Sequence, residues 1–292
     1  MNDFVFYKKR DFGMLISDTF VFFRKYAKDF FSNYLLINGA LFILIGVIAA
    51  FMFIFYGVYS SNWPLLLLIL AVLGVLSAFL VLFIICFPIA YTQLLEKNAD
   101  RSSIKAKELF VVIRKMLPRA ILFGIISFFI ILIPYFILIL VLARIFGDQI
   151  ILMQIASYFA GIVMILFMQQ FMLVYVKDGL DYFPALGKVI QELKERFWDK
   201  LGATFVMNLI ITAFSAAGIV VPLVLYFTIM FLIGIDSLIG FSLLIFTLVL
   251  IGATVVFIVS NFQIFLQILI HLGEKEGEHT DDIDLIGKHV EE

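Results

Sequence analysis

The sequence predicts an all-α, polytopic membrane helical bundle of six transmembrane helices, arranged as three hairpins that are each preceded by an amphipathic interfacial elbow helix. Three observations predict this fold class. Of the 292 residues, 64% are hydrophobic and the mean hydropathy is +1.13, far above the roughly 45–50% apolar usage of soluble domains. Six apolar stretches are long enough to cross a hydrocarbon core, which requires about 20 helical residues. The basic residues gather on one side of these stretches.

The six apolar stretches define the expected spans and leave only short connectors between them. Residues 1–272 are therefore expected to form one transmembrane domain, with no separate soluble catalytic domain. Residues 273–292 are acidic and poor in aromatic residues, which predicts a flexible acidic cytoplasmic tail. The expected spans are Tyr34–Tyr59, Pro64–Leu94, Ala120–Ala143, Ile150–Val176, Leu201–Ile235 and Leu238–Leu272.

The first elbow is expected over Asp11–Asn33, directly before the first span. Its apolar residues fall on one side of a helical wheel, while Arg24, Lys25 and Lys28 fall on the other. The apolar side is expected to rest on acyl chains or on a neighbouring membrane helix, with the basic side towards the headgroups.

The second and third elbows are expected before the third and fifth spans. The second begins near Ser103, and Pro118 is expected to separate it from the third span. The third follows Asp181, a residue type that caps helix N-termini.

The unit of elbow, outgoing span, turn and returning span recurs at residues 11–96, 102–177 and 181–272, which predicts a three-fold internal repeat. Two explanations stay open. The repeat arose by duplication, or the same bilayer boundary forces similar amphipathic segments without duplication.

The positions of the basic residues predict the orientation. With six spans, every Lys and Arg except Arg144 lies on the side of the termini. The positive-inside rule then puts both termini in the cytoplasm, so we expect a multi-pass protein of the bacterial cytoplasmic (inner) membrane. The opposite connectors, near residues 60–63, 144–149 and 234–237, are expected to be tight turns.

The sequence contains no signature of a reaction. No Asp, Glu, Lys or Arg lies clearly inside an expected span, and proton-coupled carriers and pumps usually need such a group. It contains no nucleophile elbow, HExxH zinc motif, phosphate-binding loop or dinucleotide-binding glycine pattern. We therefore expect no catalytic residue, no metal site, no cofactor and no nucleic-acid partner.

Uncharged polar residues gather towards the cytoplasmic ends of the returning spans, and three of them follow an i, i+4, i+8 stripe. Two interpretations stay open: a polar cavity that opens to the cytoplasm and binds headgroups or a small solute, or interhelical hydrogen bonds that fix the bundle. The residues concerned are Gln93, Gln169, Gln170, Asn261, Gln263, Gln267 and His271.

The basic residues of the elbows also have two interpretations. They contact anionic lipid headgroups or a docking partner, at roughly 1 kcal/mol each near the surface, or they are ordinary topology signals. The residues concerned are Arg24, Lys25, Lys28, Arg114, Lys115, Arg119, Lys194, Arg196 and Lys200.

Two stretches carry a resemblance to known proteins: LISDTFVFFRKYAKDFFSNYLL, from Leu15, and FPALGKVIQELKERFWDKLGATF, from Phe183. Each is a basic amphipathic helix that enters a span. In this layout the chain resembles a broad group of bacterial six-helix integral membrane proteins of poorly characterised function, including the membrane domain attached to some glycerophosphodiester phosphodiesterases. The resemblance implies an inner-membrane helical domain that supports a partner or handles lipid. The phosphodiesterase domain of those fusions has no counterpart here, so it implies no active-site residue.

These observations favour a non-enzymatic membrane scaffold or subunit whose partners are membrane lipids and a protein at the cytoplasmic face. The alternative is a transporter or flippase-like handler of a lipid or other hydrophobic solute. An enzyme that acts on lipid is the third hypothesis, because no reactive constellation supports it.

Overall fold

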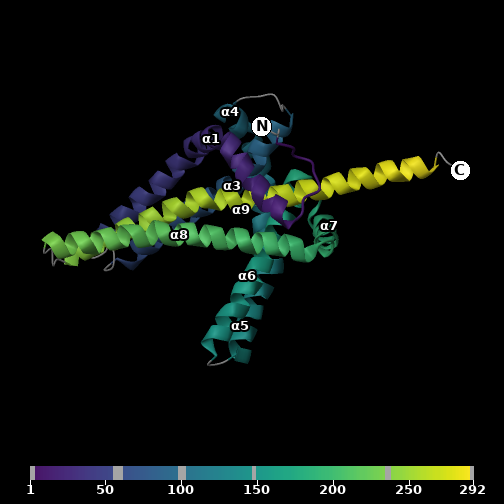
Figure 1. Cartoon of the computed structure of the whole chain (residues 1–292). Coiled ribbons are helices and arrows are strands. Elements are labelled where there is room, and N and C mark those ends of the chain that lie inside the picture. Colours follow the sequence, from purple (N-terminus) through teal and green to yellow (C-terminus); the bar gives the residue numbers. More distant parts are fainter. Residues whose placement is uncertain (1–3, 55–61, 98–102, 147–148, 234–237, 290–292) are drawn as a thin grey trace.

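The computed structural model describes residues 4–54, 62–97, 103–146, 149–233 and 238–289, which form helices and no strands (Figure 1). Two short π-helical turns, η1 and η2, continue the α-helices that precede them. The elements are α1 (Phe12–Ile54), α3 (Trp63–Lys97), α4 (Ala106–Ser127), η1 (Phe128–Leu132), α5 (Ile133–Phe146), α6 (Ile150–Met172), η2 (Leu173–Lys177), α7 (Tyr182–Lys194), α8 (Phe197–Ile233) and α9 (Leu238–His289).

Six helical segments are long and apolar enough to cross a membrane, and each overlaps one expected span. The all-α class and the six candidate spans are therefore confirmed. Of the expected turns, residues 234–237 lie outside the described residues, as do residues 60–61 and 147–148 of the other two. Of their described residues, Trp63 already begins α3 and residues 144–146 still belong to α5. The segments are Phe12–Met52, Trp63–Lys97, Ala106–Phe146, Ile150–Lys177, Phe197–Val224 and Leu250–Glu276.

Two of the three expected elbows are not separate helices. α1 runs unbroken from the first elbow into the first span. α4 continues through Pro118 to Ser127, so the expectation that Pro118 separates the second elbow from the third span is wrong. Met116 and Ala120, on either side of the proline, are both buried. Their packing holds the helix together across the hydrogen bond that proline cannot make.

The third expected elbow is a separate helix, α7. It ends because Glu195 is extended and Arg196 adopts a left-handed conformation with φ of 51°. At its start, the backbone carbonyl of Asp181 accepts a hydrogen bond from the Ala185 N–H at 2.9 Å, but the Asp181 side chain makes no capping bond. The buried residues of α7 recur every three or four positions: Tyr182, Ala185, Val189 and Leu193.

The middle part of α9, around Gln263–Leu272, lies at the centre of the molecule (Figure 1). In its most apolar window 56% of residues are buried, against 6–11% in the other five candidate spans. Every residue from Gln263 to Leu272 is buried. α9 passes through the middle of the molecule and packs against α1, α3, α6 and α8 (Figure 1). A helix that is buried on all sides needs neighbours on all sides, so α9 fixes where the others lie.

An aromatic cluster joins α1, α3 and α9. The rings of Phe22 and Phe265 stack with centroids 3.7 Å apart, and both side chains are fully buried. Tyr91 of α3 meets Phe22 edge-on at 6.3 Å, and Phe4 meets the same ring at 5.5 Å. The ring of Phe23, on the apolar side expected for the first elbow, lies 4.1 Å from that of Phe262 on α9. This part of the apolar side therefore rests on a neighbouring helix, one of the two supports expected for it.

α8 and α9 approach each other closely at two small residues. A Cβ atom on Gly218 would lie 2.6 Å from a side-chain carbon of Val255, and one on Gly252 would lie 3.1 Å from Ile219. Glycine at these positions allows two long helices to pack with their backbones near each other.

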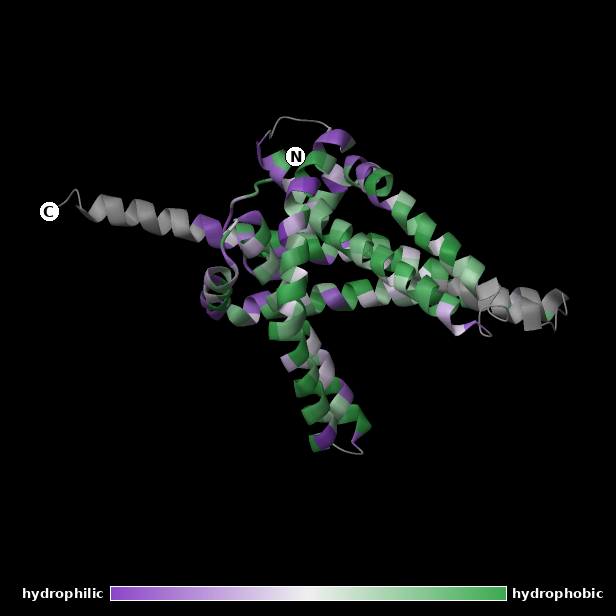
Figure 2. Cartoon of the chain, turned by 180° about the vertical axis from the view of Figure 1, so that it is seen from behind, coloured by the Kyte–Doolittle hydropathy of each residue, from purple (hydrophilic) through white to green (hydrophobic). Residues whose placement is uncertain are grey.

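Away from α9 the helices present apolar residues outwards. α5 contains no buried residue and packs on α6 and η1. The α5–α6 pair projects away from the rest of the molecule (Figure 1). Hydrophilic residues gather instead around the N-terminal segment, α7 and the adjoining parts of α8 and α9 (Figure 2). Apolar side chains that face outwards are expected where a bundle meets lipid.

The backbone of residues 273–289, for which the sequence predicts a flexible tail, is helical because α9 continues to His289. The segment contains no proline, and a helix that is already formed propagates far more easily than a new one nucleates. The flexibility of this segment and the three-fold repeat stay predictions.

We predict that Phe265→Ala lowers the free energy of unfolding by about 3–5 kcal/mol, because it empties a fully buried site in the aromatic cluster. Denaturant unfolding or thermal melting in detergent measures the change. Phe214→Ala is the matched control, because Phe214 is 59% exposed on α8; we expect a change within about 0.5 kcal/mol. Equal losses in the two variants would contradict the central place of the cluster.

Candidate functional site

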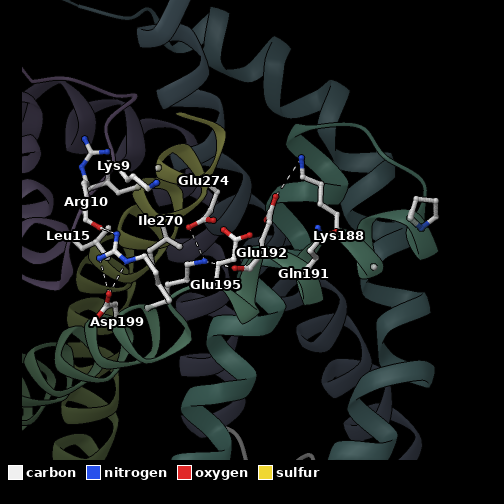
Figure 3. Close-up of a pocket in the computed structure, with 16 residues that line it drawn as sticks. Lys9, Arg10, Leu15, Lys188, Gln191, Glu192, Glu195, Asp199, Ile270 and Glu274 are labelled. Carbon is white, nitrogen blue, oxygen red and sulfur yellow. Dashed lines mark hydrogen bonds and ion pairs between the residues drawn. The ribbon is translucent and has the colours of Figure 1, made fainter. Parts of the chain in front are cut away.

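A charged cavity of about 600 Å³ lies between the N-terminal segment, α7, α9 and the turn into α8 (Figure 3). Its volume is within the roughly 300–1,000 Å³ of small-molecule pockets. It lies where hydrophilic residues gather in Figure 2. Its charged lining residues are Lys9, Arg10, Lys188, Glu192, Glu195, Arg196, Asp199, Lys200 and Glu274.

Lys200 forms the buried floor of the charged cavity. Its side chain is 5% exposed, and its Nζ lies 2.9 Å from a carboxylate oxygen of Glu274. The same ammonium donates a hydrogen bond to the backbone carbonyl of Glu192. A buried ammonium keeps its charge only with such partners, so α7, α8 and α9 are joined at this point.

Two arginines hold the N-terminal segment against the cavity. Arg10 pairs with Asp18 at 2.8 Å and donates to the backbone carbonyls of Val5, Phe6 and Lys8.

Arg196 completes this attachment from the turn between α7 and α8. It pairs with Asp199 at 2.8 Å and donates to the backbone carbonyl of Arg10 at 3.0 Å. The left-handed residue that breaks the helix is therefore also the one that contacts the N-terminal segment.

Two of the charged side chains that line the cavity have no polar partner among the described residues. Lys188 lies 3.6 Å from Glu192, and the arginines and Lys200 are paired as above. Within the described part of the chain, Lys9 and Glu195 have no hydrogen bond or ion pair. In Figure 3 they come from different elements, the N-terminal segment and the end of α7. The cavity thus offers one unpaired cation and one unpaired anion.

A cluster of ion pairs joins the ends of the returning spans. Lys177 of η2 lies 2.8 Å from Glu96 of α3. Asp178 lies 2.6 Å from Lys275 and 3.2 Å from Nε2 of His271, both on α9. We call Glu96, Lys177, Asp178, His271 and Lys275 the ion-pair cluster. It connects three helices that lie far apart in the sequence.

The pKa of the Asp178 carboxyl reflects this environment. Burial would raise this pKa, but hydrogen bonds and charges from His271 and Lys275 outweigh burial and lower it from 3.8 to about 2. Tyr7 donates a hydrogen bond to Glu96 at 3.2 Å. Burial, followed by the Glu96 carboxylate, raises the pKa of its phenol to about 12, so Tyr7 stays a neutral donor at physiological pH.

A chain of hydrogen bonds joins α6, α8 and α9. Nε2 of Gln170 donates to Oε1 of Gln267 at 2.7 Å and to the backbone carbonyl of Gln267 at 2.9 Å. Nε2 of Gln267 donates to Oγ1 of Thr204 at 2.8 Å. All three side chains are buried. For these three residues the geometry favours interhelical hydrogen bonding over the lining of a polar cavity.

Among the described residues, no hydrogen bond joins Gln93, Gln169, Asn261 and Gln263 to one another. Asn261 is buried and donates to carbonyls of its own helix, at Phe257 and Ile258. Gln263 is buried, and neither polar atom of its side chain has a hydrogen-bond partner within the described residues. Gln93 and Gln169 are half-buried.

None of the seven predicted residues, from Gln93 to His271, lines the charged cavity.

Three of the basic residues of the elbows bind elsewhere in the protein, and most of the basic residues are exposed. Arg119 donates to the backbone carbonyl of Leu180 at 2.9 Å and lies over the Tyr175 ring, while Arg196 and Lys200 are paired at the charged cavity. Lys25 is exposed and lies over the Tyr26 ring. The other exposed ones are Arg24, Lys28, Arg114, Lys115, Lys194 and Arg196.

Sequence reasoning missed most of the ion-pair cluster. From the sequence, Lys177 and Lys275 were used only to predict the orientation in the membrane. No role was predicted for Glu96 or Asp178. A signal was present, because Glu96, Lys177 and Lys275 each stand near the end of a returning span. Charges at one membrane boundary, on helices that pack together, lie at the same height and can pair.

Comparisons of the chain with protein families, with curated proteins and with solved structures find no match. The resemblance to bacterial six-helix membrane proteins stays a prediction.

Within the described residues, no group of three or more His, Cys, Asp or Glu side chains could hold a metal ion.

We predict that Gln267→Leu lowers the free energy of unfolding by about 1–3 kcal/mol, because it leaves the Gln170 amide and the Thr204 hydroxyl buried with fewer partners. The double variant Gln170→Leu, Gln267→Leu is expected to lose less than the sum of the two single losses. Denaturant unfolding in detergent measures all three. Gln93→Leu is the control, because Gln93 has no hydrogen bond to another described residue. Additive losses would contradict the coupling.

We predict that Asp178 stabilises the fold in a pH-dependent way. Because its pKa is lower in the folded protein, the stabilisation is complete above the unfolded value near 3.8 and is lost as the pH falls towards 2. The unfolding midpoints of the wild type and Asp178→Asn should therefore differ at pH 5 and converge towards pH 2. Asp199→Asn, which removes a more exposed carboxylate, is the control. A difference that stays constant from pH 5 to pH 2 would refute this role.

Proposed function

We propose that this protein is a non-enzymatic scaffold or subunit of the bacterial cytoplasmic membrane that docks a partner protein at the charged cavity. In this proposal both termini, α7 and the cavity face the cytoplasm. The distribution of basic residues supports this orientation, because Arg144 is the one Lys or Arg expected on the opposite side.

The observation that carries the proposal is the pair of unpaired charges at the cavity. Lys9 and Glu195 have no polar partner within the described residues, although seven other charged side chains line the same cavity. The paired charges hold the walls together, and the two free charges remain for a ligand. A protein segment that carries both an acidic and a basic side chain would complement them.

The surrounding packing supports docking to a preformed surface. The N-terminal segment is fixed by Arg10 and Arg196, and the floor by the Lys200–Glu274 pair. A surface that is already ordered loses little entropy when a partner binds.

The alternative, a carrier that moves a lipid through a polar path along the returning spans, has less support. Gln170 and Gln267 hydrogen-bond to each other, and the path would have to break these bonds. The implied role of the resembling membrane domains, which support a partner or handle lipid, is compatible with either function.

The test is co-purification with quantitative mass spectrometry after mild solubilisation. We expect one protein to be recovered in stoichiometric amount with the wild type. Lys9→Glu and Glu195→Lys should each lower its recovery about tenfold, which corresponds to a loss of ~1.4 kcal/mol of binding free energy. The melting temperature should stay unchanged, because neither side chain has a partner to lose.

The control variant is Lys107→Glu, a charge reversal at an exposed lysine of α4 outside the cavity. It should leave the recovery of the partner unchanged. If no protein is recovered in stoichiometric amount, or if all three variants retain it equally, docking at this cavity is excluded.

A further inference from the structure

An apolar groove lies beside α7, away from the charged cavity. Its volume is about 460 Å³, and Lys194 is the one charged residue that lines it. We call it the α6–α7 groove. Its apolar lining consists of Val163, Leu166 and Phe167 of α6, Ile190 and Leu193 of α7, and Phe197 at the start of α8.

The groove and the charged cavity use different sides of α7. The cavity is lined by Gly187, Lys188 and Gln191, among others, and the groove by Leu193 and Lys194 with Ile190. On a helical wheel these two sets point in different directions. An inference about the groove therefore goes beyond the proposed docking function and does not depend on it.

The groove opens between two candidate membrane spans. α6 belongs to the span Ile150–Lys177, and Phe197 begins the span Phe197–Val224. Val163 is 38% exposed and Ile190 is 44% exposed, so the apolar walls are accessible from outside the bundle. In a bilayer an acyl chain fills such a groove, because an empty one would lose van der Waals contacts on one side.

The α7 end of the groove carries the features of a headgroup boundary. Trp198 is 79% exposed, and its ring centroid lies 5.3 Å from that of Phe197. Exposed indole rings are favoured at the interface between headgroups and acyl chains. Val163 is nearer the middle of the candidate span Ile150–Lys177 than Phe167 is, and Phe167 is nearer its end. A chain in the groove would therefore run from the headgroup level at Trp198 towards the bilayer centre.

Lys194 supplies the charge that selects the headgroup. Its side chain is exposed and has no polar partner within the described residues. The nearby cations Arg196 and Lys200 are already neutralised by Asp199 and Glu274. We propose that the α6–α7 groove binds one acyl chain of an anionic phospholipid, whose headgroup phosphate pairs with Lys194.

Trp198, next to the groove-lining residue Phe197, provides a reporter beside the groove. The chain has two tryptophans, Trp63 and Trp198, so Trp63→Phe leaves Trp198 as the single indole. This variant is placed in phosphatidylcholine vesicles that contain increasing fractions of dibrominated phosphatidylglycerol or dibrominated phosphatidylcholine. Quenching of Trp198 then gives the relative binding constant of the two lipids. We expect the anionic lipid to bind about fivefold more strongly.

Two further changes in the same background test the two halves of the site. Lys194→Gln should bring the ratio of binding constants close to one, because it removes the cation. Val163→Phe fills the groove without touching Lys194, and it should also reduce the preference for the anionic lipid. Lys107→Gln, which removes an exposed lysine outside the groove, should keep the fivefold ratio. Melting temperatures confirm that each variant is folded.

Three results would overturn the proposal. The first is equal quenching by the two lipids in the Trp63→Phe protein. The second is a preference that survives Lys194→Gln. The third is a loss of preference of the same size in Lys107→Gln, which would mean that the whole basic surface attracts anionic lipid without a site. Since the assay contains no partner protein, these outcomes are independent of docking at the charged cavity.

Discussion

The burial of α9 from Gln263 to Leu272 is the constraint on which the other helices depend. This segment is buried on every side, so α1, α3, α6 and α8 must each cover one of its faces. The stacked rings of Phe22 and Phe265 fix the distance between α1 and α9. Among the described residues, α5 packs mainly on α6 and η1 rather than on this segment, and none of its residues is buried. The protein therefore has one packed centre, and its apolar helices extend from that centre into the expected bilayer.

Burial of α9 also decides which polar groups pair. Gln267, His271 and Lys275 lie on one stripe of the helix. Gln267 bonds to Thr204 and Gln170, and His271 and Lys275 both contact Asp178. A buried polar group without a partner costs about 1–3 kcal/mol, so these bonds hold α6, η2 and α8 at fixed heights along α9. The polar residues of the returning spans thereby set the alignment of the helices.

The sequence predicted the spans well because the length of an apolar run depends on local residues alone. Within Asp11–Asn33, Phe23 and Phe30 are buried and Arg24 is exposed, but Phe20, which was expected on the apolar side, is exposed as well. What covers the apolar side was left open, because the contact with Phe265 joins residues over 240 positions apart. The continuous helix through Pro118 and the Asp178–Lys275 pair were missed for the same reason: each depends on packing between distant segments, which no local pattern encodes.

The break in the helix at Arg196 allows α7 to border two different sites, the charged cavity and the α6–α7 groove. If α7 and α8 were one helix, as α1 is with its elbow, the faces of α7 would follow those of α8 along the span. The left-handed residue turns α7 away, and the contacts of Arg196 with Asp199 and the Arg10 carbonyl keep it in place. One helix then borders both the charged cavity and the α6–α7 groove. A lipid and a partner bound at these sites would share α7, so any coupling between them has to act through its position, and that coupling must be reciprocal.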